Sequence, residues 1–216
     1  MSALLEQILN FFGFIGSLVC HQRTEKTLIV GGRFLPVCTR CTGAYLGILI
    51  GYFILFFRKK KAKGPPNLWG TLVLSMPMII DTVTQTLGIR ESTNSLRLIT
   101  GLFFGVALLP FLIYMLQLVP RMQHFPLLSV ISPKKPQIDD VKNPWISSKA
   151  LLLGALTCLG TFFAINYATS SSKPYLYWII AFPIVFSIIA HIFLLPTLIL
   201  GSLVYDFLKS RATRVT

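Results

Sequence analysis

Three of the four cysteines and one of the three histidines lie between positions 20 and 41 of the chain. Cys38 and Cys41 form a C-x-x-C motif, whose spacing suits either a metal knuckle or a redox disulfide. Cys20 and His21 could supply the third and fourth ligands, or one of them could act together with a water molecule. The set predicts a site for zinc or another transition metal. A softer ion such as copper(I) would favour the thiolates over the histidine.

The same cysteines allow two other interpretations. On the outer side of a membrane, thiols meet oxidising conditions, so the C-x-x-C could be a disulfide that is only a structural cross-link. A C-x-x-C at the mouth of a helix bundle also resembles the quinone-coupled thiol oxidoreductases, which shuttle electrons through a second cysteine pair. Here the remaining cysteines are Cys20 and Cys158, and Cys158 falls in the middle of a later apolar segment. Metal site, inert cross-link and redox pair all stay open.

A second group of polar residues lies in and after the third apolar segment. Asp81 and Gln85 are about one helical turn apart, and an ionisable residue inside a membrane helix is a functional candidate by default. Arginine suits oxyanions because its planar guanidinium donates in a fork. We therefore expect Arg90, Arg97 and Gln85 to orient an anionic group, with Asp81 as general acid or base. The alternative is an ion pair between Asp81 and Arg90 or Arg97 that only orders this end of the helices.

The composition places these residues in a membrane protein. Of the 216 residues, 54% are hydrophobic and only 12% are charged, and the mean hydropathy is +0.70. A soluble domain usually carries about twice that share of charge. Several apolar runs approach or exceed the roughly 20 residues that cross a bilayer. The first run lacks a preceding basic segment and a following small-residue cleavage site, so we expect a retained helix rather than a signal peptide.

The predicted fold is all-α, a polytopic transmembrane helix bundle in a single membrane domain. It has about six helices, or five if the first does not span the membrane. The expected helices cover residues 3–20, 37–57, 68–87, 96–118, 149–168 and 175–207. The segment 120–148 is rich in proline, lysine and aspartate and is expected to be a cytoplasmic loop.

Two helix faces carry specific expectations. One face of the first helix holds a row of small and polar residues: Glu6, Asn10, Gly13, Ser17 and Cys20. Because polar side chains in contact with lipid are costly, we expect this face to turn into the bundle. In the second helix, Gly43, Gly47 and Gly51 form a small-xxx-small series, which lets another helix approach closely.

The basic residues predict an orientation in the membrane. The formal net charge is +13, and 13 of the 20 Lys and Arg residues fall at the ends expected inside: five in 58–63, five in 121–149 and three in 209–214. This positive-inside bias predicts a protein of the cell (inner) membrane with both termini cytoplasmic. The same charges favour contact with the anionic lipid bilayer, and no aromatic-interleaved basic patch suggests nucleic acid. The cysteines, Asp81 and the arginines then converge on the outer face.

The ordered motifs resemble a known family. They are Cys20-His21-Gln22, then the segment 36–45 (Pro-Val-Cys-Thr-Arg-Cys-Thr-Gly-Ala-Tyr), then a polar series that runs from Asp81 to Gly101. Together they resemble a family of small prokaryotic integral membrane proteins classed as a domain of unknown function, over roughly residues 17–105. The resemblance implies a membrane protein in which the Cys-His and Asp/Arg groups belong together, and it implies no particular reaction.

Two classes of function remain after the sequence alone. The first is a metal-dependent membrane enzyme that acts on a lipid-linked or anionic substrate at the outer face. The second is a non-enzymatic metal or small-solute carrier, or a structural membrane protein in which the cysteines are a disulfide or metal cross-link. Metal content and thiol state separate the two.

Overall fold

A computed structural model describes residues 3–58, 68–118 and 148–212. The helices are α1 (Ala3–Ser17), α2 (Thr39–Arg58), α3 (Leu68–Thr86), α4 (Asn94–Leu118), α6 (Ser148–Ser170) and α7 (Tyr175–Ala212). Between α1 and α2 lie a 3-10 turn (Thr24–Lys26) and a small antiparallel hairpin of β1 (Ile29–Val30) and β2 (Arg33–Phe34). The predicted all-α bundle is confirmed. The expected loop 120–148 lies outside the described residues except for its last residue.

Four of the described helices are long and apolar enough to cross a membrane: α2, α4, α6 and α7. The 19 residues of α3 are less apolar. The 15 residues of α1 reach only about 22 Å, which is short of the roughly 30 Å of a bilayer core. Large apolar side chains are exposed around the bundle, for example Phe53, Phe57, Val73, Leu152, Phe163, Ile179 and Phe186. Such a surface is stable in lipid and costly in water.

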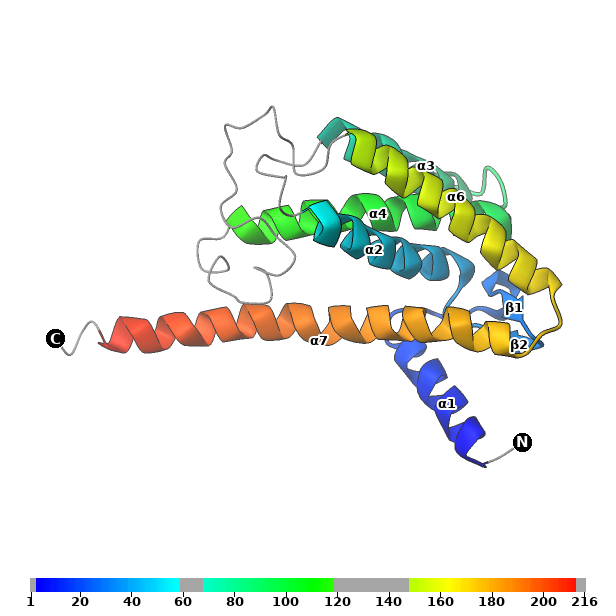
Figure 1. Cartoon of the computed structure of the whole chain (residues 1–216), viewed down its shortest axis with the longest axis horizontal. Helices are drawn as coiled ribbons and strands as arrows, with labels where there is room; N and C mark the ends of the chain where they lie inside the picture. Colours follow the sequence, from blue (N-terminus) through cyan, green and yellow to red (C-terminus); the bar gives the residue numbers. More distant parts are fainter. Residues whose placement is uncertain (1–2, 59–67, 119–147, 213–216) are drawn as a thin grey trace.

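The helices α2 and α4 form the centre of the bundle (Figure 1). Helices α3 and α6 pack on one side of this pair, and α7 packs on the other side, against α2. Accordingly α4 is the most enclosed of the four candidate spans. In its apolar span 56% of the residues are buried, against 28% in that of α6. The remaining helix, α1, packs against α7 and extends away from the bundle.

The contact between α2 and α4 depends on glycines that leave room for the facing backbone. A Cβ atom at Gly47 would lie 2.3 Å from the carbonyl oxygen of Leu102, and one at Gly105 would lie 2.2 Å from that of Ala44. In the neighbouring pair, Gly43 lies beside Gly101. Residue numbers therefore increase in the same direction along α2 and α4, which means that the two helices run parallel. The close approach predicted from the small-xxx-small series is confirmed. It places the N-termini of both helices at the same end of the bundle.

The prediction for the polar face of α1 is wrong. Glu6, Asn10 and Ser17 are exposed, and the helix instead buries Phe12 and Ile15. The Phe12 ring packs against α7, with centroid distances of 5.2 Å to Phe182 and 5.8 Å to Trp178. The expectation assumed that lipid surrounds the helix wherever protein does not. A helix too short to span can expose a polar face to water at the membrane surface.

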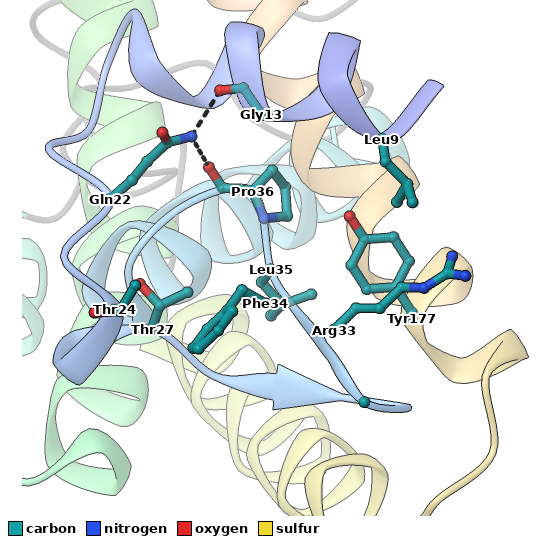
Figure 2. Close-up of a pocket in the computed structure, with 11 residues that line it drawn as sticks. Leu9, Gly13, Gln22, Thr24, Thr27, Arg33, Phe34, Leu35, Pro36 and Tyr177 are labelled. Atoms are coloured by element: carbon teal, nitrogen blue, oxygen red, sulfur yellow. Dashed lines mark hydrogen bonds between the residues drawn. The ribbon is translucent and has the colours of Figure 1, made fainter. Parts of the chain in front are cut away.

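The segment between α1 and α2 is held by Gln22 (Figure 2). The Gln22 side chain donates hydrogen bonds to the carbonyl oxygens of Gly13 (2.6 Å) and Pro36 (2.7 Å). It therefore ties the end of α1 to the start of α2. Gln22 has a positive φ of 49°, which is uncommon for a residue other than glycine. At the tip of the hairpin, Gly31 and Gly32 have φ values of 55° and 80°, a backbone conformation that favours glycine.

We predict that Gly105→Ala weakens the α2–α4 contact. The added methyl group has no space against the Ala44 carbonyl, and overpacking of this kind costs about 1–3 kcal/mol. The expected result is a lower unfolding temperature of the purified protein in detergent. Gly160→Ala on α6 is the matched control, because that glycine is exposed and its Cβ would meet no atom within 4 Å. Equal unfolding temperatures for the two variants would contradict the packing described for α2 and α4.

Candidate metal centre

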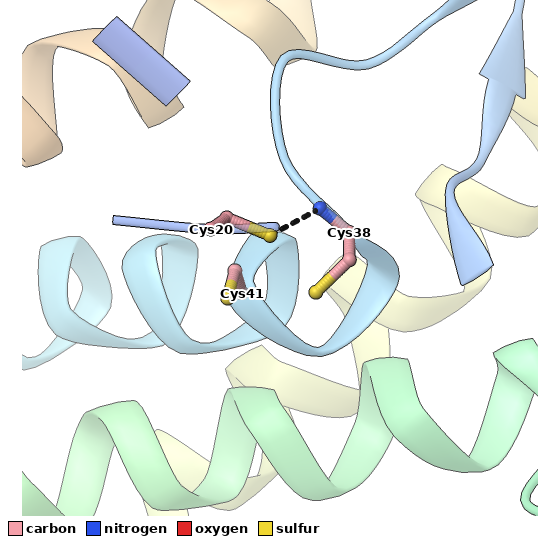
Figure 3. A group of neighbouring side chains, drawn as sticks. All are labelled: Cys20, Cys38 and Cys41. Carbon is pink, nitrogen blue, oxygen red and sulfur yellow. Dashed lines mark hydrogen bonds between the residues drawn. The ribbon is translucent and has the colours of Figure 1, made fainter. Parts of the chain in front are cut away.

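Cys20, Cys38 and Cys41 form a cluster at the start of α2 (Figure 3). Their three sulfur atoms all lie within 4.8 Å of one another. Cys38 precedes the first helical residue, and its carbonyl accepts a hydrogen bond from the Thr42 backbone N–H at 2.8 Å. Cys41 follows in the first turn, and Cys20 reaches the pair from the segment after α1. The C-x-x-C and the separate Cys20 are thus brought together, as the predicted metal site requires.

The Cys20 sulfur lies where positive electrostatic potential is concentrated. It accepts hydrogen bonds from the backbone N–H groups of Cys38 (3.2 Å) and Gln22 (3.5 Å). Free N–H groups at the N-terminus of a helix favour negative charge. Hydrogen bonds from the Cys38 and Cys41 thiols, supported by these backbone groups, hold the pKa of Cys20 well below its usual value. Cys20 is therefore poised to be a thiolate, the form that binds metals.

The cysteines line a cavity of about 310 Å³ that we call the cysteine pocket. Its wall combines the three thiols with basic side chains and is formed by Val19, Cys20, His21, Gln22, Arg23, Lys26, Cys38, Arg40 and Cys41. His21 lines this pocket and is exposed, but its ring nitrogens are not part of the group of donor atoms within 4.8 Å. His21 as a fourth ligand stays a prediction. Cys158 lies apart, buried in α6.

Asp81 forms the centre of a second cluster at the same end of the bundle. It is only 1% exposed, and its carboxylate pairs with Arg40 on one oxygen and with Arg90 at 3.0 Å on the other. Arg40 also donates to the Gln85 side chain at 3.1 Å. The structure therefore brings together Asp81, Gln85 and Arg90, as expected, and shows the ion pair with Arg90 that was the structural alternative.

Arg97 is placed differently from the expected ion pair. The residue is buried, at 6% exposure, and its guanidinium donates a hydrogen bond to the Asn94 side chain at 3.3 Å. Its Nε atom is buried without a hydrogen-bond partner among the described residues. A buried guanidinium with an unmatched donor is unusual. Arg97 does not belong to the wall of the cysteine pocket.

Two further residues, Arg40 and Gln22, organise the site. Arg40 links the two clusters, because it lies between Cys38 and Cys41, lines the cysteine pocket and pairs with Asp81. Gln22 holds Cys20 in place through its two hydrogen bonds to backbone carbonyls. The position of Arg40 between two cysteines indicated an effect on their thiols, but it did not indicate the pairing with Asp81. Nothing in the sequence pattern indicated that Gln22 would bridge two carbonyl groups.

The part of the chain that matches known proteins includes both clusters. The family described as "Predicted membrane protein (DUF2085)" matches residues 20–111. An uncharacterised protein of Methanocaldococcus jannaschii is 40% identical over 111 residues, which are 48% of this chain and 71% of the relative. The chain belongs to the DUF2085 family. An uncharacterised protein of Methanothermobacter thermautotrophicus is 41% identical over 90 residues, which are 42% of this chain and 80% of that protein.

The region shared with the DUF2085 family contains both clusters. Its span of 20–111 runs from Cys20 through the cysteine pocket, Asp81 and Arg90 to the part of α4 that packs on α2. The helices α6 and α7 fall outside it. No solved structure matches the chain. The chain is therefore a membrane protein of the DUF2085 family with a cysteine cluster able to hold a metal ion.

We predict that Asp81→Asn destabilises the bundle, because Arg40 and Arg90 would lose the buried carboxylate with which they pair. The cost should be about 2 kcal/mol, below the 3–5 kcal/mol of a fully buried pair because both arginines are partly exposed. Thermal unfolding in detergent measures the change. Glu91→Gln is the control, since Glu91 is exposed. Unchanged stability in Asp81→Asn would contradict a structural role for the ion pair.

Proposed function

We propose that this membrane protein binds one transition metal ion, zinc in the simplest case, through the thiolates of Cys20, Cys38 and Cys41. The observation that carries the proposal is the mutual distance of the three sulfur atoms, all within 4.8 Å. Zinc–sulfur bonds of about 2.3 Å in tetrahedral geometry require sulfur atoms about 3.8 Å apart. The cluster therefore needs only small side-chain adjustments to accept the ion.

The fourth coordination position faces the cysteine pocket in this proposal. Three protein ligands and one open position are typical of zinc sites that act on a substrate rather than sites that only support a fold. The cavity wall carries Arg23, Lys26 and Arg40, which favour an anionic ligand such as a phosphate or carboxylate group. A bound metal ion would supply Lewis acidity at that position. This supports a metal-dependent membrane enzyme with an anionic or lipid-linked substrate.

The predicted catalytic residues take positioning roles in this proposal. Asp81 is buried and accepts from two guanidinium groups, which is unfavourable for a general acid or base. Asp81 and Gln85 instead hold the Arg40 guanidinium, and Arg90 neutralises the other carboxylate oxygen. Arg97 is buried at the start of α4 and does not line the cysteine pocket, so it takes no part in this proposal. The net positive charge of this cluster supports the binding of anions near the metal.

The charge pattern supports a location of the site at the outer face of the cell (inner) membrane. The basic runs predicted to be cytoplasmic fall at the other ends of the helices, as the positive-inside rule requires. A metal carrier would use the same three thiolates, and a quinone-coupled oxidoreductase would oxidise two of them. The redox alternative lacks a second cysteine pair, because Cys158 is buried in α6 away from Cys20.

We predict about one zinc ion per chain in protein purified in detergent without chelators. Cys20→Ser, Cys38→Ser and Cys41→Ser should each lose most of this metal, because each variant removes one of only three protein ligands. Cys158→Ser is the matched control and should keep it. Metal analysis by mass spectrometry, combined with thiol titration, provides the measurement.

Two results would overturn the proposal. A metal-free protein with Cys38 joined to another cysteine of the cluster would support the cross-link or redox alternative. Metal retained equally in all four serine variants would show that the ion binds elsewhere. To separate an enzyme from a carrier, cobalt-substituted protein can be titrated with phosphate. A spectral change would show that an anion reaches the open coordination position.

A further inference from the structure

A second cavity lies beside the cysteine pocket, and we call it the α1–α7 cavity (Figure 2). It has a volume of about 590 Å³, within the usual range for sites that bind small molecules. Its wall is formed by α1, the hairpin segment and α7: Leu9, Gly13, Gln22, Thr24, Thr27, Gly32, Arg33, Phe34, Leu35, Pro36 and Tyr177. Gln22 also lines the cysteine pocket, so the two cavities are neighbours.

The wall of the α1–α7 cavity has an apolar part and a cationic part. Leu9, Leu35 and the Tyr177 ring supply apolar surface, and Arg33 supplies a positive charge. The Arg33 guanidinium lies 6.0 Å from the centroid of the Tyr177 ring, a cation–π distance that helps to fix its position. A ligand that matches this wall has an apolar chain and an anionic group. Lipids with an anionic head group have this chemistry.

Helix α1 has three distinct faces, which place it at the membrane surface. One face is buried against the protein and includes Phe12 and Ile15. A second face exposes Glu6, Asn10 and Ser17, and a third exposes large apolar residues: Leu4, Phe11, Phe14 and Leu18. A helix that borders protein, water and lipid at once requires this pattern. With a length of about 22 Å, α1 fits the interface rather than a span.

The apolar face of α1 continues onto the membrane surface of the bundle. Phe11 and Phe14 are 51% and 61% exposed, and Phe182 on α7 is 58% exposed. Phe12 joins the two surfaces, because its ring packs edge-on against Phe182. The residues of α1 and α7 that line the cavity, Leu9, Gly13 and Tyr177, lie on other faces of these helices.

We propose that the α1–α7 cavity binds an anionic lipid, with an acyl chain against α1 and α7 and the head group at Arg33. This extends the proposed function, because Gln22 lines both this cavity and the cysteine pocket. A lipid held here would therefore lie next to the cysteine pocket. Lipid binding itself requires no metal, so the two proposals can fail separately.

The test is a titration of detergent-purified protein followed by native mass spectrometry. The probes are phosphatidylglycerol, phosphatidylcholine with the same acyl chains, and glycerol phosphate, which has no chain. We expect phosphatidylglycerol to bind about tenfold more tightly than phosphatidylcholine, since one charge pair of about 1.4 kcal/mol corresponds to that factor. Glycerol phosphate should bind at least as weakly as phosphatidylcholine.

Two variants and their matched controls locate the site. Arg33→Gln should remove the preference for phosphatidylglycerol, whereas Lys173→Gln, an exposed cation outside the cavity, should keep it. Gly13→Phe should weaken both lipids, because a Cβ at Gly13 meets no atom within 4 Å and the ring would occupy part of the cavity. Gly160→Phe, on an exposed position of α6, is its control.

Several outcomes would overturn the lipid proposal. Equal lipid preference in Arg33→Gln and Lys173→Gln would show that the head group binds elsewhere. Tight binding of glycerol phosphate would indicate a site for soluble anions instead. If Gly13→Phe fails to fold, the comparison of Arg33→Gln with Lys173→Gln still tests whether the head group binds at Arg33. Metal content measured on the same samples should stay unchanged, which separates this result from the test of the metal site.

Discussion

The close backbone contact between α2 and α4 is the constraint on which the rest of the structure depends. At Gly47 and Gly105 the facing carbonyls leave no space for a Cβ atom, so the two helices are fixed in depth as well as in direction. This contact sets the position of the start of α2, where Cys38 directly precedes the helix and Arg40 and Cys41 lie in its first turn. In a bilayer, where apolar side chains gain little by leaving lipid, such packing of small residues is a main source of helix association.

Charge organises the end of the bundle that this contact creates. Asp81 is almost fully buried and is matched by Arg40 and Arg90. Two arginines on one carboxylate leave net positive charge next to three thiols, and the pKa of one of these thiols, Cys20, is lowered. This combination stabilises a thiolate at Cys20 and attracts anions. The same cluster therefore favours both the proposed metal ion and an anionic ligand beside it.

The sequence predicted the class of fold and the grouping of the cysteines, because hydropathy and the C-x-x-C spacing are local signals. It also predicted the glycine contact, which has a short periodic pattern. The pairing of Arg40 with Asp81 could not be predicted, since it joins residues 41 positions apart and several arginines were equal candidates. The polar face of α1 was assigned wrongly because the rule applied to it holds for spanning helices. Glu6 and Asn10 are exposed on a helix too short to span.

The central claim is that three cysteine sulfurs hold a metal ion whose fourth position is open. Zinc K-edge X-ray absorption on the purified protein tests it most directly. The account predicts three sulfur scatterers at about 2.3 Å and one oxygen or nitrogen at about 2.0–2.1 Å, without the outer-shell pattern of an imidazole ring. Four sulfurs, or an imidazole signal that disappears in His21→Ala, would show a closed site and contradict the open position. Absence of sulfur scatterers would contradict the metal site itself.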